Sequence, residues 1–90
     1  MDFSNTVVAS SEMLTSNMVD EAIVLNLPKG IYYGLNKVGL RTWQLIQQPQ
    51  CISDIYSTLL EEYDADPDQC KKDLLAFLQD LYQQKLIEVQ

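Results

Sequence analysis

The 90-residue chain has a globular composition, with 47% hydrophobic residues and a formal net charge of −7. This length accommodates one modest core, so residues 1–90 are predicted to form a single domain. No apolar stretch is long enough to span a membrane, and the N-terminus lacks the pattern of a signal peptide, so we expect a cytoplasmic protein with no membrane partner. Residues 51–90 hold nine of the 13 acidic residues and three lysines. This half would repel a phosphate backbone, which argues against a nucleic-acid partner.

The residue types that catalysis and metal binding need are largely missing. The chain contains no histidine, which excludes serine–histidine and cysteine–histidine nucleophile pairs. Cys51 and Cys70 lie 19 positions apart, a separation that matches no metal-ligand spacing, and a cytoplasmic setting predicts free thiols. Glu61 and Glu62 are neighbours on a predicted helix and therefore point apart. We expect no enzymatic activity, no metal and no cofactor.

The first third of the chain contains the β-branched and aromatic runs that are typical of strands. Thr6–Ala9 is a short run, and residues 22–27 and 31–35 are two clearer ones. Between the last two stands Pro28-Lys29-Gly30, which predicts a three-residue hairpin loop, because proline presets φ at the first turn position and glycine takes the left-handed position. The segment around residues 13–18 is less regular, so the bounds of the first strands stay open.

The predicted loop also sets a register for the hairpin. A three-residue loop pairs residue 27 with 31, 25 with 33 and 23 with 35. These six apolar side chains would share the face that is directed at the core: Ile23, Leu25, Leu27, Ile31, Tyr33 and Leu35. The opposite and more polar face would carry Val24, Asn26, Tyr32 and Gly34.

From Asn36 onward the apolar period is that of a helix. Asn36 is the predicted N-cap of a first helix, which ends before Pro49. Its apolar side consists of Val38, Thr42, Leu45 and Ile46. A second helix is predicted from about residues 51–53 to about residue 63. Its buried side consists of Ile52, Ile55 and Leu59.

The third helix has the strongest start signal in the chain. Asp66 can cap it, Pro67 suits its first position, and Gln69 can close a capping box. The helix is predicted to continue to about Gln84, and residues 86–89 are predicted to form a short terminal strand or an extended tail. At helical spacing its core-facing stripe consists of Cys70, Leu74, Phe77, Leu78 and Leu81.

Strands followed by three helices with tight turns predict an α+β fold, in which the second and third helices are placed like a helix-turn-helix. This arrangement raises the alternative of a winged-helix DNA-binding regulator. The exposed side of the third helix opposes it, because Asp73 and Asp80 stand where a recognition helix would carry basic or amide groups. The two aspartates flank Phe77, and two interpretations stay open. In the first, Phe77 belongs to the core and the aspartates are solvated. In the second, Phe77 forms the bottom of a groove whose acidic rim suits an apolar peptide segment flanked by Lys or Arg.

Several stretches together resemble a known family. Residues 25–39 read LN…G-x-Y-Y-x-LN-x-x-G, Trp43 follows, and residues 59–64 (LLEEYD) and 73–78 (DLLAFL) lie further on. This joint pattern, which runs from about Val7 to Val89, resembles the PqqD-like family. Its members are leader-recognition domains (RiPP recognition elements) of ribosomally made, modified peptides, and they include the discrete leader-binding proteins of lasso-peptide pathways.

The chain departs from the family pattern at three places, one of which is the less regular first-strand region with Met13, Leu14 and Met18. Cys51 stands where a capping threonine is usual, so Ser53 is the alternative cap of the second helix. Thr42 stands where a branched apolar residue is common, which indicates looser packing before Trp43.

The resemblance implies a winged helix-turn-helix-like fold with a three-stranded antiparallel sheet and three helices. It also implies that a precursor's leader peptide adds as a strand to the edge strand Ile31–Leu35 and places side chains in the cleft between this strand and the third helix. A modifying or leader-cleaving enzyme of the same pathway would be the second partner. The candidate peptide-binding residues are Ile31, Tyr32, Tyr33, Gly34, Leu35, Asp73, Ala76, Phe77 and Asp80. The remaining alternative is a protein–protein docking module that binds only a partner enzyme.

Overall fold

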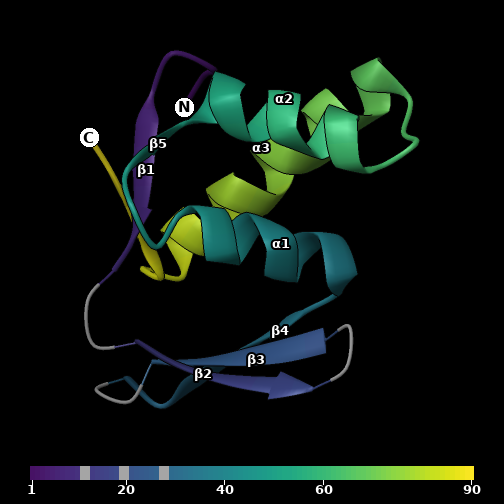
Figure 1. Ribbon diagram of the computed structural model, residues 1–90. Helices are drawn as coiled ribbons and strands as arrows, with labels where there is room; N and C mark the ends of the chain where they lie inside the picture. Colours follow the sequence, from purple (N-terminus) through teal and green to yellow (C-terminus); the bar gives the residue numbers. More distant parts are fainter. Residues whose placement is uncertain (11–12, 19–20, 27–28) are drawn as a thin grey trace.

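The computed structural model describes residues 1–10, 13–18, 21–26 and 29–90, with the backbone alone for residues 13–18, 21 and 31. Figure 1 shows the order of the elements along the chain and their arrangement in space. The strands are β1 Thr6–Ala9, β2 Met13–Met18, β3 Glu21–Asn26, β4 Ile31–Leu35, β5 Gln50–Cys51 and β6 Ile87–Val89. The helices are α1 Lys37–Leu45, α2 Ile52–Glu62 and α3 Pro67–Gln83. Among the described helices, none is long and apolar enough to cross a bilayer.

The strands form two antiparallel sheets rather than one. The first has the order β2-β3-β4 and lies below α1 in Figure 1, and the second has the order β5-β1-β6 and lies beside the helices. The α+β prediction is therefore confirmed, as are the strand at Thr6–Ala9 and the terminal strand. The second sheet was not predicted as a unit, because the residues that pair in it, such as Val7 and Val89, stand at opposite ends of the chain.

The hairpin of β3 and β4 has a different register from the predicted one. Asn26 pairs with Ile31 and Val24 with Tyr33, so four residues separate the paired strand ends instead of three. Since side chains alternate between faces, a shift of one residue exchanges the two faces of β3. Val24 is 0% exposed, whereas Ile23 is 37% exposed. The prediction was wrong for β3 and correct for β4, where Leu35 is buried and Tyr32 is exposed.

Local hydrogen bonding accounts for part of this register. Asn26 is buried with its side chain, and its Oδ1 accepts a hydrogen bond from the backbone N–H of Lys29 at 3.3 Å, so this buried polar group is satisfied. Gly30 has a φ of +65°, which confirms the left-handed position that the sequence assigned to it. The predicted roles of Leu27 and Pro28 lie outside the described residues.

Two of the three helices begin as the sequence predicts. Asn36 caps α1 by accepting a hydrogen bond from the N–H of Gly39 at 2.8 Å, and Asp66 caps α3 by accepting one from the N–H of Gln69 at 3.0 Å. Among the described residues no hydrogen bond returns from the Asp66 N–H to the Gln69 side chain, so the capping box is incomplete, and Nε2 of Gln69 donates to Asp73. Pro67 occupies the first position of α3, as expected.

The start of α2 is built differently from the prediction. Cys51 stands at its N-cap without a side-chain capping bond, and Ser53 lies inside the helix, so the expectation that Ser53 caps α2 was wrong. The N–H groups of Ile52 and Ser53 donate instead to the carbonyl oxygens of Asn5 and Phe3, at 2.9 and 3.1 Å. The N-terminal segment therefore supplies acceptors that helix starts usually take from a capping side chain.

The core lies between the second sheet, the three helices and the inner face of the hairpin. Helix α3 contributes Leu74, Leu78 and Leu81, which confirms most of its predicted stripe. Cys70 and Phe77 are only half-buried and lie at the margin of the core. Val38 was predicted on the apolar side of α1 but is 42% exposed. These marginal residues surround the site described next.

Candidate functional site

Strand β4 is an edge of its sheet. The order β2-β3-β4 gives β4 a strand neighbour on one side only, among the described residues, so backbone N–H and C=O groups on its other side have no ladder partner. The strand turns Tyr33 and Leu35 inward and Tyr32 and Gly34 outward. Tyr32 is 76% exposed, and a Cβ added to Gly34 would meet no atom within 4 Å. The outer face of this edge is therefore open.

The inner face of β4 is attached to α3. The hydroxyl of Tyr33 donates a hydrogen bond to Oδ2 of Asp80 at 2.5 Å, and the Tyr33 ring lies 6.2 Å from that of Phe77, tilted by 57°. Burial, and then the hydrogen bond and negative charge of Asp80, raise the pKa of Tyr33 to about 12. Tyr33 thus contacts both Phe77 and Asp80, and all three are among the predicted peptide-binding residues.

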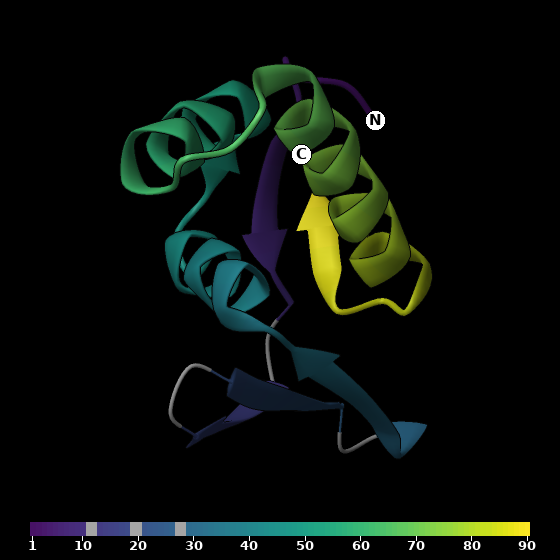
Figure 2. The ribbon, with the colours of Figure 1, turned by 90° about the vertical axis from the view of Figure 1, so that its right-hand side faces the viewer.

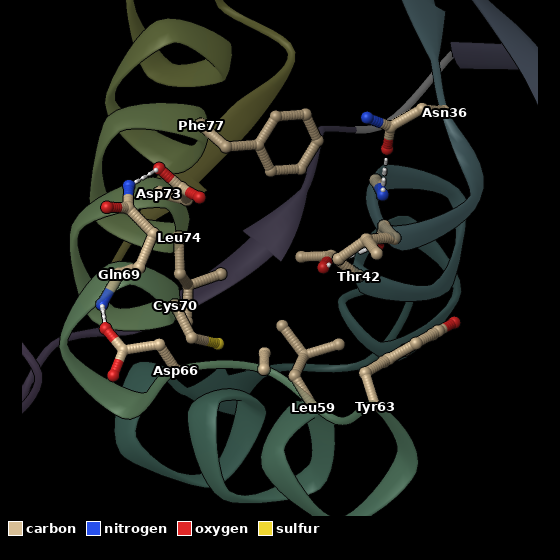
Figure 3. Close-up of a pocket in the computed structure, with 13 residues that line it drawn as sticks. Asn36, Thr42, Leu59, Tyr63, Asp66, Gln69, Cys70, Asp73, Leu74 and Phe77 are labelled. Atoms are coloured by element: carbon tan, nitrogen blue, oxygen red, sulfur yellow. Dashed lines mark hydrogen bonds between the residues drawn. The ribbon is translucent and has the colours of Figure 1, made fainter.

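A pocket of about 440 Å³ lies next to Phe77, between α1, α2 and α3. Figure 3 shows the ring of Phe77 reaching from α3 toward Asn36, with Thr42, Leu59 and Leu74 around the open space. Most of these walls are apolar, and Thr42 turns its hydroxyl away from them by donating to the carbonyl of Val38 at 3.0 Å. The pocket therefore suits an apolar side chain.

The close approach of Phe77 to α1 depends on a glycine. A Cβ at Gly39 would lie 3.4 Å from Cζ of Phe77 and 3.3 Å from Oδ1 of Asn36, which is the atom that caps α1. A larger residue at this position would displace the aromatic ring or the cap. Gly39 therefore shapes one wall of the pocket.

Acidic groups lie along the α3 side of the pocket. Asp66 and Asp73 both line it and both are exposed. Gln69 joins them, because its backbone N–H donates to Asp66 and its Nε2 donates to Asp73 at 2.8 Å (Figure 3). Burial, and then the charge of Asp73, raise the pKa of the Cys70 thiol nearby. The pocket thus combines an apolar interior with a negatively charged side.

Three further predicted site residues, Leu35, Ala76 and Asp80, do not line the pocket. Leu35 is in the core, so only its backbone is available to a ligand. Ala76 is exposed on α3, on the same side as Asp73 and Asp80 at spacings of three and four residues. Asp80 is bonded to Tyr33 and is not a free charge on the rim.

Sequence reasoning missed the part of the pocket that α1 and α2 supply. Asn36, Val38 and Thr42 come from the start of α1, and Leu59 and Tyr63 from the end of α2. The available signal was Gly39, whose missing side chain in a helix indicates a close neighbour. Nothing in the spacing of α2 distinguishes Leu59 from any other core leucine.

The fold and the site define a small α+β protein with an open sheet edge beside an apolar pocket on a helix. The family model for coenzyme PQQ synthesis protein D (PqqD) matches residues 21–87, and the chain belongs to this family. The chain is also similar to a solved structure described as TbiB1 in complex with the TbiA(beta) leader peptide, at 31% identity and a TM-score of 0.81. The match covers 90% of this chain and 94% of the other. No curated protein matches the chain significantly.

Proposed function

We propose that this chain binds the leader segment of a ribosomally synthesised precursor peptide by strand addition to β4, and presents it to a modifying or leader-cleaving enzyme of the same pathway. Membership of the PqqD family and the likeness to a protein solved with a leader peptide support leader binding. The observation on this chain that carries the proposal is the open edge of β4 together with the pocket at Phe77, whose ring packs against Tyr33 of β4. The sequence resemblance favours a lasso-peptide pathway.

Backbone pairing would supply affinity and the pocket would supply selectivity. An added strand alternates its side chains as β4 does, so every second leader residue would face α3 on the side of Tyr33, and the others would lie beside Tyr32 and Gly34. The residues facing α3 would reach Phe77 and the pocket. Its volume of about 440 Å³ falls within the range of roughly 300–1,000 Å³ that is typical of ligand pockets.

The proposal contains no chemical step by this chain. The sequence has no histidine, and the described residues contain no group of three or more His, Cys, Asp or Glu placed to hold a metal ion. The chain would act in the cytoplasm as a binding protein, and the chemistry would belong to the enzyme that receives the leader.

Isothermal titration with a synthetic leader peptide of the pathway's precursor tests the proposal. Wild type should bind the leader alone, and Phe77→Ala should weaken binding by about tenfold or more, because a central aromatic side chain carries much of the binding energy in such pockets. Tyr82→Ala is the matched control, since Tyr82 is an exposed aromatic residue of α3 that does not line this pocket. Its affinity should stay within about twofold of wild type.

Phe77 also packs against Tyr33 and the wall at Gly39, so circular dichroism must show that Phe77→Ala is folded, and Phe77→Leu provides a variant that keeps most of the packing. A Phe77→Ala protein that is folded and binds as tightly as wild type would remove Phe77 from the proposed site. If wild type does not bind the leader alone but binds it in the presence of the pathway enzyme, the docking-module alternative would be favoured.

A further inference from the structure

Residues 2–5 form a compact turn that places Phe3 against the helices. A carboxylate oxygen of Asp2 accepts hydrogen bonds from the backbone N–H and the hydroxyl of Ser4, at 2.8 and 2.5 Å. Oδ1 of Asn5 accepts a further one from the N–H of Asp2 at 2.8 Å. Figure 2 shows this N-terminal segment beside the first turns of α3. The turn is therefore closed by its own side chains, and Phe3 within it is half-buried against the core.

The ring of Phe3 contacts both α2 and α3. It stacks on Tyr56 of α2, with 5.1 Å between the ring centroids and 26° between the planes. Nζ of Lys71, in the second turn of α3, lies over the Phe3 ring at 4.8 Å from its centroid. Stacking of two rings at such a distance and a cation over an aromatic face are both attractive. A single side chain of the N-terminal segment therefore joins the two helices.

Two further sets of hydrogen bonds strengthen this junction. The carbonyl oxygen of Phe3 accepts from the N–H of Ser53 at 3.1 Å and from Sγ of Cys51 at 3.3 Å, which fixes the segment to the start of α2. The hydroxyl of Tyr56 donates to the carbonyl of Pro67, the first residue of α3, at 3.2 Å. The start of α3 is thus held against α2 through both Phe3 and Tyr56.

These contacts are adjacent to the residues of α3 that line the pocket at Phe77. Pro67 follows Asp66 and Lys71 follows Cys70, and both Asp66 and Cys70 line the pocket. Helix α2 and the turn after it supply the neighbouring walls. Because successive residues of a helix are about 100° apart, the contacts with the N-terminal segment lie on a flank of α3 beside the pocket lining. A displacement of the first turns of α3 relative to α2 would therefore change the width of the pocket.

We infer that Phe3 is a positioning residue for the pocket: by holding the first turns of α3 against α2, it fixes the separation of the walls that these helices supply. This inference rests on the proposed function, and it adds a segment outside the binding site that controls how tightly the leader is bound. Loss of the Phe3 ring removes the shared partner of Tyr56 and Lys71, so the first turns of α3 would move away from α2. No atom that lines the pocket is removed by this change.

Titration of a synthetic leader peptide of the pathway's precursor measures the effect on binding. Phe3→Ala should weaken the affinity by about three- to tenfold, the size of effect that substitutions outside a binding site have when they alter its packing. Phe3→Tyr keeps the ring and should stay within about twofold of wild type. Circular dichroism must show that Phe3→Ala is folded, and Phe3→Leu, which keeps apolar bulk but has no ring face, replaces it if it is not.

The thiol of Cys70 gives a second readout that needs no leader. In a Cys51→Ser background, which keeps a hydrogen-bond donor for the Phe3 carbonyl, Cys70 is the only thiol, and its rate of alkylation by iodoacetamide reports access to the pocket wall. Phe3→Ala should raise this rate about threefold or more. The rate should change little in low concentrations of urea, because local opening exposes much less surface than global unfolding.

The outcomes separate this inference from the proposed function. An unchanged Cys70 rate in folded Phe3→Ala, or a rate that rises steeply with urea as global unfolding does, would overturn the inference while leader binding by wild type stands. Equal affinities of Phe3→Ala and wild type for the leader would also overturn it. Absence of binding between wild type and the leader would instead overturn the proposed function, and with it the role of Phe3 in binding.

Discussion

At the scale of single residues, Asp80 is the site residue whose observed position differs most from the one that sequence spacing predicts. The sequence places it on an acidic rim, and the structure places its carboxylate against the hydroxyl of Tyr33. Because β4 has a strand neighbour on one side only within the described part of the chain, this hydrogen bond and the contact of Tyr33 with Phe77 attach the edge strand to α3. The width of the proposed binding cleft therefore depends on one tyrosine and one aspartate that are 47 positions apart.

This contact predicts a loss of stability at alkaline pH. The pKa of Tyr33 is raised to about 12 in the folded chain, against an ordinary value of 10.0. A raised folded-state pKa contributes stability that is complete below pH 10 and is lost as the pH rises from 10 to 12, because the unfolded tyrosine ionises first. The melting temperature of wild type should fall more steeply over this interval than that of Tyr33→Phe. Parallel curves for the two proteins, followed by circular dichroism, would contradict the prediction.

Gly34 predicts an effect on binding without an effect on folding. A side chain at this position meets no atom within 4 Å in the free protein, and the strand lacks the positive φ that would penalise one. Gly34→Leu should therefore fold at least as stably as wild type, since glycine inside a strand is itself destabilising. An added strand would lie beside the new side chain, so leader affinity should fall by about fivefold or more. Unchanged affinity in a titration would show that no ligand approaches this position.

At the scale of elements, the start of α3 deserves a test because it forms one side of the pocket. Asp66 caps this helix, so Asp66→Ala should lower the free energy of unfolding by about 1 kcal/mol. Asp68→Ala is the control, since Asp68 is an acidic residue in the first turn without the capping position. Asp68→Ala should lower the free energy of unfolding by only about 0.3–0.5 kcal/mol, because it removes one favourable interaction with the helix dipole. Urea denaturation measures both, and equal losses would show that the cap contributes nothing beyond charge.

Elements were more predictable from the sequence than the pairing between them. Asn36 and Asp66 mark helix starts through local chemistry, and both caps form as expected. The hairpin register depends on whether the loop has three or four residues, and local residue types permit both. The burial of Asn26 resolves the choice, since its side chain is satisfied by Lys29 in the four-residue arrangement, and a periodicity argument that assigns asparagine to the solvent face misses this.

The pocket illustrates a second limit of the sequence. Its walls come from residues as far apart as Asn36 and Phe77, and the spacing along each helix marks only which side is apolar. Phe77 was singled out because aspartates flank it, and it lines the pocket. Val38 was predicted only on the apolar side of α1, because an apolar residue at helical spacing has the same pattern whether it faces the interior or a pocket.

At the scale of the whole molecule, the uneven charge should govern how a ligand approaches. The acidic half of the sequence contributes Asp66 and Asp73 to the pocket. This negative charge attracts and orients a basic part of an approaching peptide before contact, since the fields of exposed charges extend about 10 Å at 0.1 M salt. Orientation in this way changes the association rate more than the lifetime of the complex.

Asp73→Asn therefore predicts a kinetic effect that depends on salt. For a leader with a basic residue beside its apolar anchor, the association rate constant should fall about two- to threefold at 20 mM salt and by less than about 1.5-fold at 500 mM, while the dissociation rate changes little. Asp68→Asn makes the same charge change outside the pocket lining and separates the local effect from that of net charge. Stopped-flow fluorescence of a labelled leader measures both rates. A loss of the same size at both salt concentrations would mean that Asp73 acts through a desolvated contact in the bound state, because only an exposed charge is screened by salt.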